Sequence, residues 1–281
     1  MNVQQKLALS FIRTKLNLLA TVNKNEAASQ AFKLFCTPLA KYNPAECDVF
    51  LKGKKINFEL NGYIVRGYQC NYPRQKKVLI LHGFSSSCQN FESYVQPFIE
   101  KDYEVLAFDA PAHGSSEGST VNALEYSDMV KKVIELYGPV QYFLAHSFGG
   151  LAISLAMESL PHDENTKIVL IAPATETSSA IDNALQMIGI RNPSMRKSID
   201  ELIFKISGKE TAWFSIKRAV KNIKASILWI HDEDDDVTPV HDARAVEKDN
   251  HGNVRFIFTK GLGHRRIYKD PVVKELVFDF I

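Results

Sequence analysis

The fold of this chain is decided by residues 140–150, whose sequence is Val-Gln-Tyr-Phe-Leu-Ala-His-Ser-Phe-Gly-Gly. The apolar run over residues 140–144 predicts a buried strand, and the small apolar residues from Gly149 onward predict a helix packed tightly on a sheet. His146, Ser147 and Phe148 are expected in the turn between them. A serine at so sharp a corner projects its Oγ away from the backbone, beside the first amide of the helix.

Space at such a corner is limited, so the positions two before and two after the serine must be small. Ala145 and Gly149 meet this requirement on either side of Ser147. A small-x-Ser-x-Gly pentapeptide also occurs in ordinary strand-to-helix turns. Its meaning therefore depends on the residues elsewhere in the chain.

Composition narrows the classes of function. The 281 residues include 34 Lys and Arg and 32 Asp and Glu, so no net field favours nucleic acid or an acidic substrate. We expect small neutral or apolar substrates. Four cysteines at irregular spacing, without a CxxC pair, argue against a zinc site or a disulfide framework. They are interpreted as reduced thiols of a cytoplasmic protein.

Residues 1–36 are expected to form two helices separated near residues 21–25. The apolar run after Lys6 is interrupted by Arg13 and Lys15, whereas a secretory signal needs about 7 to 15 apolar residues and a membrane span about 20. One face of the first helix carries Leu9, Ile12, Leu16 and Leu19. Packing of this face on the domain is favoured over attachment to a membrane surface, which is the alternative for a basic, leucine-rich helix.

Strands and helices alternate along the rest of the chain. Two alternating segments flank Asn61-Gly62 and predict an antiparallel hairpin at a sheet edge. Further strands are expected at residues 78–81, 104–108, 140–144, 167–171, 226–230 and 254–258. Helices near residues 91–101, 120–137 and 240–248 and at the C-terminus separate them. This order predicts an α/β fold with a mainly parallel central sheet covered by helices on both faces, and chemistry beyond the carboxyl ends of the strands.

One interval is too long for a simple connection. About fifty residues, 174–223, separate two predicted strands, with helices expected at residues 179–187, 195–206 and 210–221. A long excursion at this edge indicates a helical lid. The predicted organisation is therefore a helical extension over residues 1–50 and an α/β domain over residues 51–281 that contains the lid. Three apolar lid residues are candidate substrate contacts, with packing as the alternative: Met187, Trp213 and Phe214.

A serine hydroxyl needs a base within hydrogen-bond reach and an acid that orients the base. His264 follows the last predicted strand within Gly261-Leu-Gly-His and is the candidate base. Segment 231–239 follows the preceding strand and offers several carboxylates. A calcium loop over this segment is not predicted, because Val237 stands where an EF-hand loop needs glycine.

Acyl transfer also needs two amide donors for the oxyanion. The turn supplies the backbone N–H of Phe148. The loop after strand 78–81 is expected to supply the N–H of Phe84.

Over nearly all of residues 55–281 the chain resembles the α/β-hydrolases. The resemblance is carried by four segments: His82-Gly-Phe84; residues 108–116, which are similar to the D-x-x-G-x-G-x-S loop; residues 145–149, which are similar to the nucleophile elbow G-x-S-x-G with Ala145 in place of its first glycine; and Gly263-His264. Ala112 stands where the second of these often has its first glycine. The resemblance implies the α/β-hydrolase fold, a Ser-His-Asp hydrolase site and no cofactor or metal.

The resemblance also selects an acid. In a family loop of the form H-G-x-x-D-x-x-V-P, the acid corresponds to Asp235, with Asp234 and Asp236 as alternatives. Asp232 at the glycine position and Thr238 at the valine position depart from that pattern.

The resulting hypothesis is a cytoplasmic, cofactor-free serine hydrolase that cleaves a small or medium-sized carboxylic ester or thioester through an acyl-enzyme. Ser147, His264 and Asp235 are its candidate catalytic residues. Two alternatives remain: a hydrolase of amide or carbon–carbon bonds with the same fold, and a non-catalytic receptor or signalling protein for a small molecule. The sequence makes no prediction of oligomeric state.

Overall fold

The structure is a computed structural model that describes residues 3–38, 45 and 47–281, so the first two residues of the predicted N-terminal helix lie outside it. The chain divides into two compact units. We call residues 1–37 and 176–214 the helical unit, and residues 38–175 and 215–281 the sheet unit.

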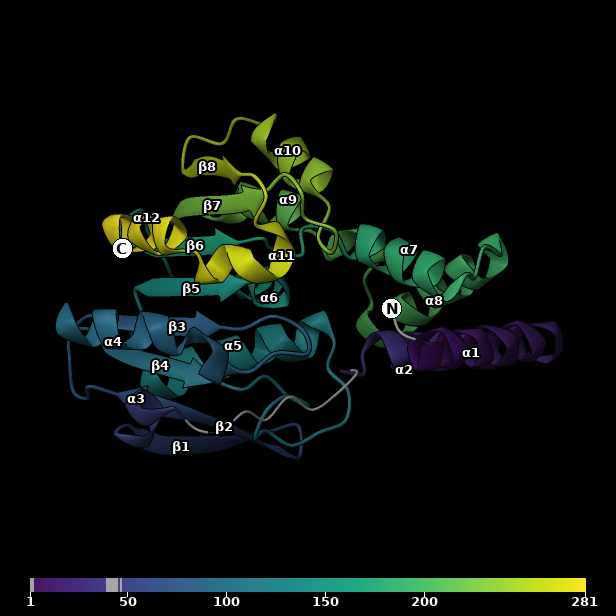
Figure 1. Cartoon of the computed structure of the whole chain (residues 1–281), viewed down its shortest axis with the longest axis horizontal. Coiled ribbons are helices and arrows are strands. Elements are labelled where there is room, and N and C mark those ends of the chain that lie inside the picture. Colours follow the sequence, from purple (N-terminus) through teal and green to yellow (C-terminus); the bar gives the residue numbers. More distant parts are fainter. Residues whose placement is uncertain (1–2, 39–44, 46) are drawn as a thin grey trace. The chain divides into compact units, whose positions relative to one another are not determined.

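The sheet unit is built on one eight-stranded sheet (Figure 1). In spatial order its strands are β1 (Lys54–Leu60), β2 (Tyr63–Cys70), β4 (Glu104–Phe108), β3 (Lys77–Leu81), β5 (Tyr142–His146), β6 (Lys167–Ile171), β7 (Ser226–Asp232) and β8 (Val254–Thr259). The β1–β2 and β2–β4 pairs are antiparallel, and all other pairs are parallel. The predicted edge hairpin is confirmed, with left-handed backbone at Asn61 and Gly62 in its turn.

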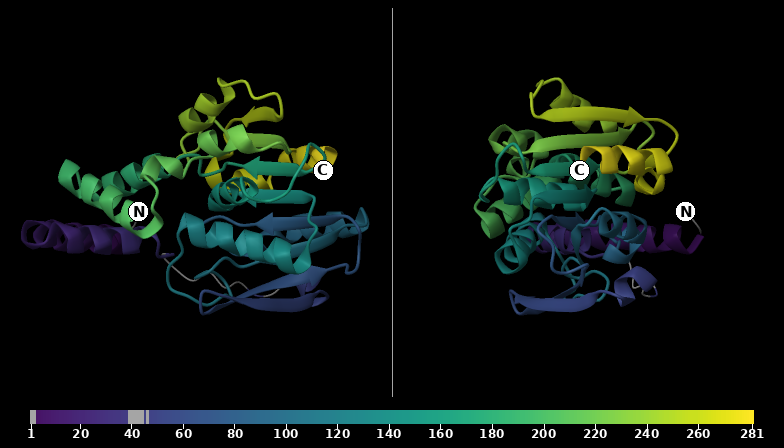
Figure 2. Two further views of the ribbon diagram at one scale, coloured as in Figure 1. Left: turned by 180° about the vertical axis from the view of Figure 1, so that it is seen from behind. Right: turned by 90° about the vertical axis from the view of Figure 1, so that its left-hand side faces the viewer.

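Helices cover both faces of this sheet, as predicted (Figures 1 and 2). On one face, α4 (Glu92–Glu100) and α12 (Pro271–Phe280) pack on alternate strand residues in one apolar cluster. On the other face lie α5 (Ala123–Tyr137) and α6 (Phe148–Met157). Shorter helices complete the unit: α3 (Asp48–Leu51), η1 (Cys88–Phe91), α9 (Ile216–Ala219), η3 (Val220–Asn222), α10 (Val240–Glu247), α11 (Gly263–Arg266) and η4 (Ile267–Lys269).

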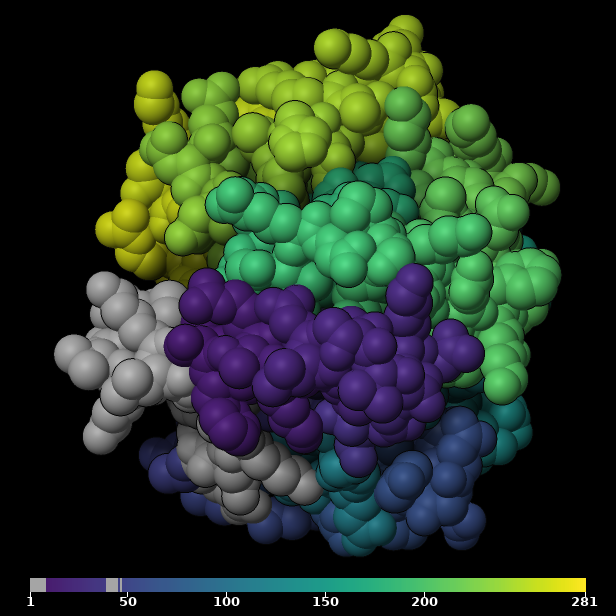
Figure 3. Space-filling model, turned by 90° about the vertical axis from the view of Figure 1, so that its right-hand side faces the viewer, coloured from purple at the N-terminus to yellow at the C-terminus, as the bar shows by residue number. Residues whose placement is uncertain are grey.

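The helical unit joins two distant segments of sequence. It contains α1 (Val3–Val22), α2 (Lys24–Phe35), α7 (Thr177–Ile188), α8 (Pro193–Ser207) and η2 (Thr211–Trp213). Asn23 ends the first helix and caps the second by accepting the N–H of Glu26. Helix α2 packs on α8, and α1 packs on α2 and α7 (Figure 3, purple and green). The sequence predicted these helices individually but not that the N-terminal pair would contact the inserted pair.

Two predicted boundaries are wrong. His146 is the last residue of β5 rather than part of the turn, because it pairs with β6, so the turn begins at Ser147. The single helix expected over residues 210–221 is three short segments instead. Ser215 has extended backbone (φ −139°, ψ 129°), and its side chain accepts the N–H of Arg218, which starts a new helix there.

The sheet and α6 approach each other closely at Gly149. A Cβ atom at this position would lie 2.6 Å from the carbonyl oxygen of Leu81 in β3 and 2.9 Å from that of His82. Both contacts are with backbone, which cannot move aside as a flexible side chain can. Glycine is therefore required at this point for β5 to turn directly into α6.

We predict that Gly149→Ala destabilises the protein by about 1–3 kcal/mol, because the added methyl group forces backbone apart. Gly252→Ala is the matched control, since a Cβ there meets nothing within 4 Å. Thermal unfolding followed by circular dichroism measures both. Equal melting temperatures for the two variants would contradict the assigned contact.

Candidate active site

Ser147 lies at the corner between β5 and α6 in a backbone conformation that non-glycine residues rarely adopt (φ 54°, ψ −118°). Its N–H donates to Ile171 O (3.1 Å), and its carbonyl oxygen accepts from Ala174 N–H (3.0 Å). These bonds to residues at and just beyond the end of β6 hold the strained residue in place. The serine side chain is consequently presented at the carboxyl ends of the parallel strands.

His264 lies against this serine. Its Nε2 is 3.0 Å from Ser147 Oγ, although the two residues are 117 positions apart in sequence. The histidine is in the first turn of α11, directly after Gly263, whose positive φ of 60° allows the chain to turn sharply after β8. The structure therefore brings the predicted nucleophile and the predicted base within hydrogen-bond distance.

Asp235 contacts the other ring nitrogen. Its Oδ2 lies 2.8 Å from His264 Nδ1, and its side chain is fully buried. The carboxylate also accepts the N–H groups of Val237 and Thr238 (2.8 Å each) and the hydroxyl of Thr238 (2.8 Å). Burial raises the pKa of Asp235, but the bonds from His264 and these amides outweigh it, so its pKa lies below the usual value.

The ionised Asp235 assigns the protons in this chain of groups. A carboxylate only accepts, so Nδ1 of His264 must carry a proton, and in the neutral ring Nε2 is then an acceptor for the Ser147 hydroxyl. The alternative acid Asp234 faces elsewhere and accepts the N–H of Gly261 (3.0 Å). Geometry thus favours Asp235 among the three candidate carboxylates.

Asp232, which the sequence marked only as a departure from a glycine, holds two loops together. Oδ1 accepts the N–H groups of Asp234 (3.0 Å) and Gly263 (2.9 Å), and Oδ2 accepts the N–H of Leu262 (3.1 Å) and the hydroxyl of Thr259 (2.7 Å). Asp234 precedes Asp235, and Gly263 precedes His264. One buried carboxylate therefore ties the acid loop to the histidine loop.

His146 was also missed as a site residue. Its ring lies 4.8 Å from that of His264, and its Nε2–H donates to the His264 carbonyl oxygen (3.1 Å). Burial, with the neighbouring His264 as a smaller cause, lowers the pKa of His146 to about 3, so the ring stays neutral near pH 7. It supports the backbone of His264 and carries no charge. Only its position beside the serine could have indicated this.

The two predicted oxyanion donors lie on adjoining segments. Phe148 opens α6, and Phe84 follows Gly83, where a Cβ would lie 2.9 Å from Ser147 Cβ. The Phe84 and Phe148 rings meet edge to face with centroids 5.8 Å apart. Both residues are therefore beside the serine.

The loop that carries Phe84 is braced by the segment after β4. The N–H of Ser85 donates to His113 Nε2 (2.9 Å), and Ala110 N–H donates to His82 Nε2 (2.9 Å). Asp109 accepts from Ser87, Cys88 and Ser115. Ala112 has a φ of 66°, which explains why glycine is common at that position.

The three predicted lid contacts belong to the helical unit. Met187 is 69 % exposed, Trp213 is half-buried and Phe214 is buried, with the two aromatic rings 5.1 Å apart. Their contact with a substrate remains a prediction.

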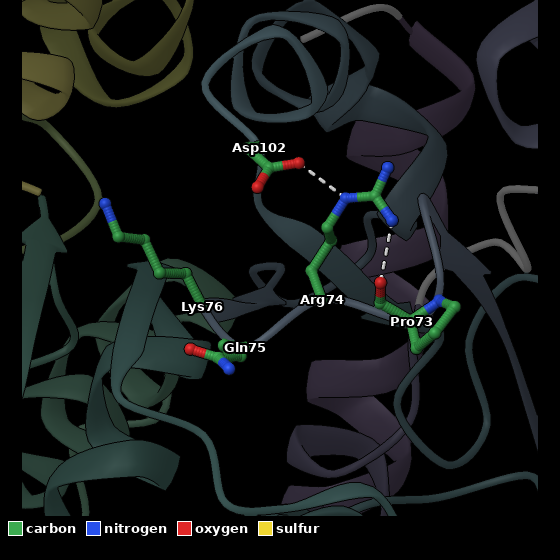
Figure 4. A pocket seen from close by; sticks show the side chains of 5 residues that line it. All are labelled: Pro73, Arg74, Gln75, Lys76 and Asp102. Atoms are coloured by element: carbon green, nitrogen blue, oxygen red, sulfur yellow. Dashed lines mark hydrogen bonds and ion pairs between the residues drawn. The ribbon is translucent and has the colours of Figure 1, made fainter.

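A separate surface pocket lies at the opposite ends of the strands. It is lined by Pro73, Arg74, Gln75, Lys76 and Asp102, which precede β3 and β4. Figure 4 shows the Arg74 guanidinium directed to Asp102 and to the Pro73 carbonyl. This lining offers no nucleophile beside a base, so the chemistry is assigned to the Ser147 edge.

No helix in the part of the chain that the structure describes is both long and apolar enough to cross a bilayer. Within the same residues, no group of three or more His, Cys, Asp or Glu side chains is arranged to hold a metal ion.

Comparison with known proteins identifies relatives among hydrolases. Residues 72–205 match the family model described as serine aminopeptidase, S33. The chain is 26% identical over 137 residues to the putative esterase/lipase 2 of Mycoplasma pneumoniae, an alignment of 46% of this chain and 51% of that protein. It is 28% identical over 242 residues to the lysophosphatidylserine lipase ABHD12 of Danio rerio, covering 77% of this chain and 60% of that one. The chain thus spans about half the length of the curated relatives it matches.

Among solved structures, an esterase of Pyrococcus furiosus superposes with a TM-score of 0.63 at 20% identity, over 87% of this chain and 97% of that one. A mainly parallel sheet with a serine at a strained strand-to-helix turn defines the class as an α/β fold of the nucleophile-elbow type. Its fold is that of the α/β-hydrolases.

We predict that Asp232→Asn loosens the contact between Asp235 and His264. The asparagine side chain would place its NH2 group against backbone N–H or hydroxyl groups that previously donated to a carboxylate oxygen. Leaving these buried donors unpaired costs about 1–3 kcal/mol of stability. The downfield proton resonance of His264 Nδ1–H should broaden or move upfield. Asp234→Asn is the control, because it removes one acceptor of the Gly261 N–H without touching Asp232. An unchanged resonance in Asp232→Asn would exclude this positioning role.

Proposed function

We propose that this chain is a serine hydrolase that cleaves carboxylic esters or thioesters through an acyl-enzyme. The observation that supports it is the continuous series of contacts from Asp235 through His264 to Ser147, at 2.8 and 3.0 Å. This geometry matches what a hydroxyl nucleophile needs. A neutral imidazole accepts the hydroxyl proton, and an acid on the far side of the imidazole keeps the ring in the required tautomer.

In the proposed reaction, Ser147 Oγ attacks the substrate carbonyl carbon while His264 Nε2 takes its proton. The carbonyl oxygen becomes an oxyanion, for which the backbone N–H groups of Phe84 and Phe148 are the proposed donors. His264 then passes the proton to the leaving alcohol or thiol, and the acyl group remains on Ser147. Water, deprotonated by His264, then attacks the acyl-serine; the bond to Ser147 Oγ breaks, His264 returns the proton to that oxygen, and the acid is released.

Throughout this cycle Asp235 stabilises the imidazolium of His264 without taking its proton, in keeping with the lowered pKa of that carboxyl group. Thr238 adds a hydroxyl donor to the same carboxylate. The neutral His146 beneath His264 introduces no second positive charge that would disfavour the imidazolium.

Esters are favoured as substrates by the relatives, whose names include an esterase/lipase and a lysophosphatidylserine lipase. Esters and thioesters are also cleaved more easily than amides by this mechanism, because an alkoxide or a thiolate is a better leaving group than an amide anion. Amide hydrolysis is the second candidate, supported by the match of residues 72–205 to the serine aminopeptidase model.

We predict that a fluorophosphonate probe labels the purified protein at Ser147, located by mass spectrometry, and that Ser147→Ala abolishes labelling. On p-nitrophenyl esters and acyl thioesters of graded length, the same substitution should reduce kcat by about 10⁶-fold. Peptide p-nitroanilides in the same panel test the amide alternative. A folded wild type that is neither labelled nor active would favour a small-molecule receptor instead.

We further predict that Asp235→Asn lowers kcat by about 10⁴-fold with little change in KM, because the amide favours the wrong tautomer of His264. Asp236→Asn is the matched control on the adjacent residue and should retain wild-type kcat. If Asp236→Asn were the more damaging change, the acid would have to be reassigned.

A further inference from the structure

Helix α1 presents a second apolar face that is separate from the one predicted to pack. Leu16, on the predicted face, is buried. Phe11, Leu18 and Val22 lie on a different side and are 71%, 64% and 87% exposed. At 100° per residue these three side chains project within about 40° of one another, along about 16 Å of helix.

Exposed apolar side chains are concentrated in the helical unit. Of the twelve large apolar side chains found exposed among the described residues, six belong to residues 1–37 and 176–214: Phe11, Leu18, Val22, Met187, Phe204 and Ile206. These segments make up 76 of the 281 residues. Isolated exposed apolar residues need no explanation, but an aligned set on one helix indicates an interaction surface.

The charge of the same unit is unbalanced. Residues 1–25 contain four basic residues (Lys6, Arg13, Lys15 and Lys24) and no Asp or Glu. The whole helical unit has ten basic and six acidic residues, a net charge of +4, whereas the remaining 24 basic and 26 acidic residues give the sheet unit −2. Lys15 is exposed and lies on the same side of α1 as Phe11 and Leu18.

This charge decides among possible occupants. A symmetric contact between two copies would place the same +4 unit against itself, which opposes association. An anionic lipid surface offers negative charge to this positively charged unit, with Lys15 on the inserted side, and an apolar boundary to Phe11, Leu18 and Val22. We infer that α1 docks the chain on anionic membranes, lying in the plane of the interface with its Phe11–Leu18–Val22 face inserted.

This docking does not depend on the proposed serine chemistry, since none of these residues belongs to the site around Ser147. It requires only shallow insertion, consistent with the finding that no described helix is suited to cross a bilayer. Both contributions, apolar insertion and charge, can be removed separately by substitution on the exposed face.

Co-sedimentation of the full chain with vesicles tests the inference, using phosphatidylcholine vesicles with and without phosphatidylglycerol. The wild type should pellet with the anionic vesicles and be released by high salt. Phe11→Ser/Leu18→Ser and, separately, Lys15→Glu should each lower the partition coefficient by about tenfold or more. The matched control Leu51→Ser/Val272→Ser removes two side chains of the sheet unit that are 55% and 62% exposed, and should bind as the wild type does.

Circular dichroism establishes that each variant keeps its helices. Wild-type protein that stays in the supernatant with anionic vesicles would overturn the inference. So would Phe11→Ser/Leu18→Ser binding equal to wild type, because the assigned face would then be wrong. Sedimentation velocity tests for self-association. If the wild type were a dimer and Phe11→Ser/Leu18→Ser a monomer, the exposed face of α1 would bind a second copy of the chain, and the inference would be overturned.

Discussion

The left-handed backbone at Ser147 is the constraint on which the candidate site depends. A non-glycine residue with φ 54° and ψ −118° is unfavourable by itself, and persists because the surrounding structure over-determines it. β5 holds one side through the sheet, while Gly149 and Gly83 allow backbone to approach where any Cβ would collide. The energy that holds the serine in this conformation therefore comes from the packed sheet.

A second feature of the site is that buried carboxylates hold its loops together. Asp109, Asp232 and Asp235 each accept three or more hydrogen bonds from backbone amides and side chains of neighbouring loops. Taking an ionised carboxylate out of water is costly, and several N–H and O–H donors are needed to offset it. Because each bond is directional, each carboxylate also fixes where its loops lie. The positions of these loops thus depend on hydrogen bonds to buried charges as well as on packing.

The sequence was sufficient for the sheet, for the edge hairpin and for the proximity of Ser147, His264 and Asp235, because period, turn residues and the order of motifs are local properties. It was insufficient where tertiary contacts determine the element boundaries and the additional residues of the site. His146 joined β5 because β6 was there to pair with it, and Ser215 interrupted a helical pattern because its own side chain formed a better cap. Asp232 and His146 became site residues only once β7 and β8 had brought their loops together. Such contacts between distant segments cannot be predicted from a single sequence.

The construction of the helical unit from residues 1–37 and 176–214 has a consequence for biosynthesis. Helices α1 and α2 leave the ribosome long before α8, which ends at Ser207, 172 residues after Phe35. At roughly 5–20 residues per second, that interval lasts about 9 to 34 s. Throughout it, α2 lacks the helix α8 on which it packs in the folded chain, while strands β1 to β6 are being synthesised. The nascent chain thus leaves an amphipathic segment without its folded partner during this period.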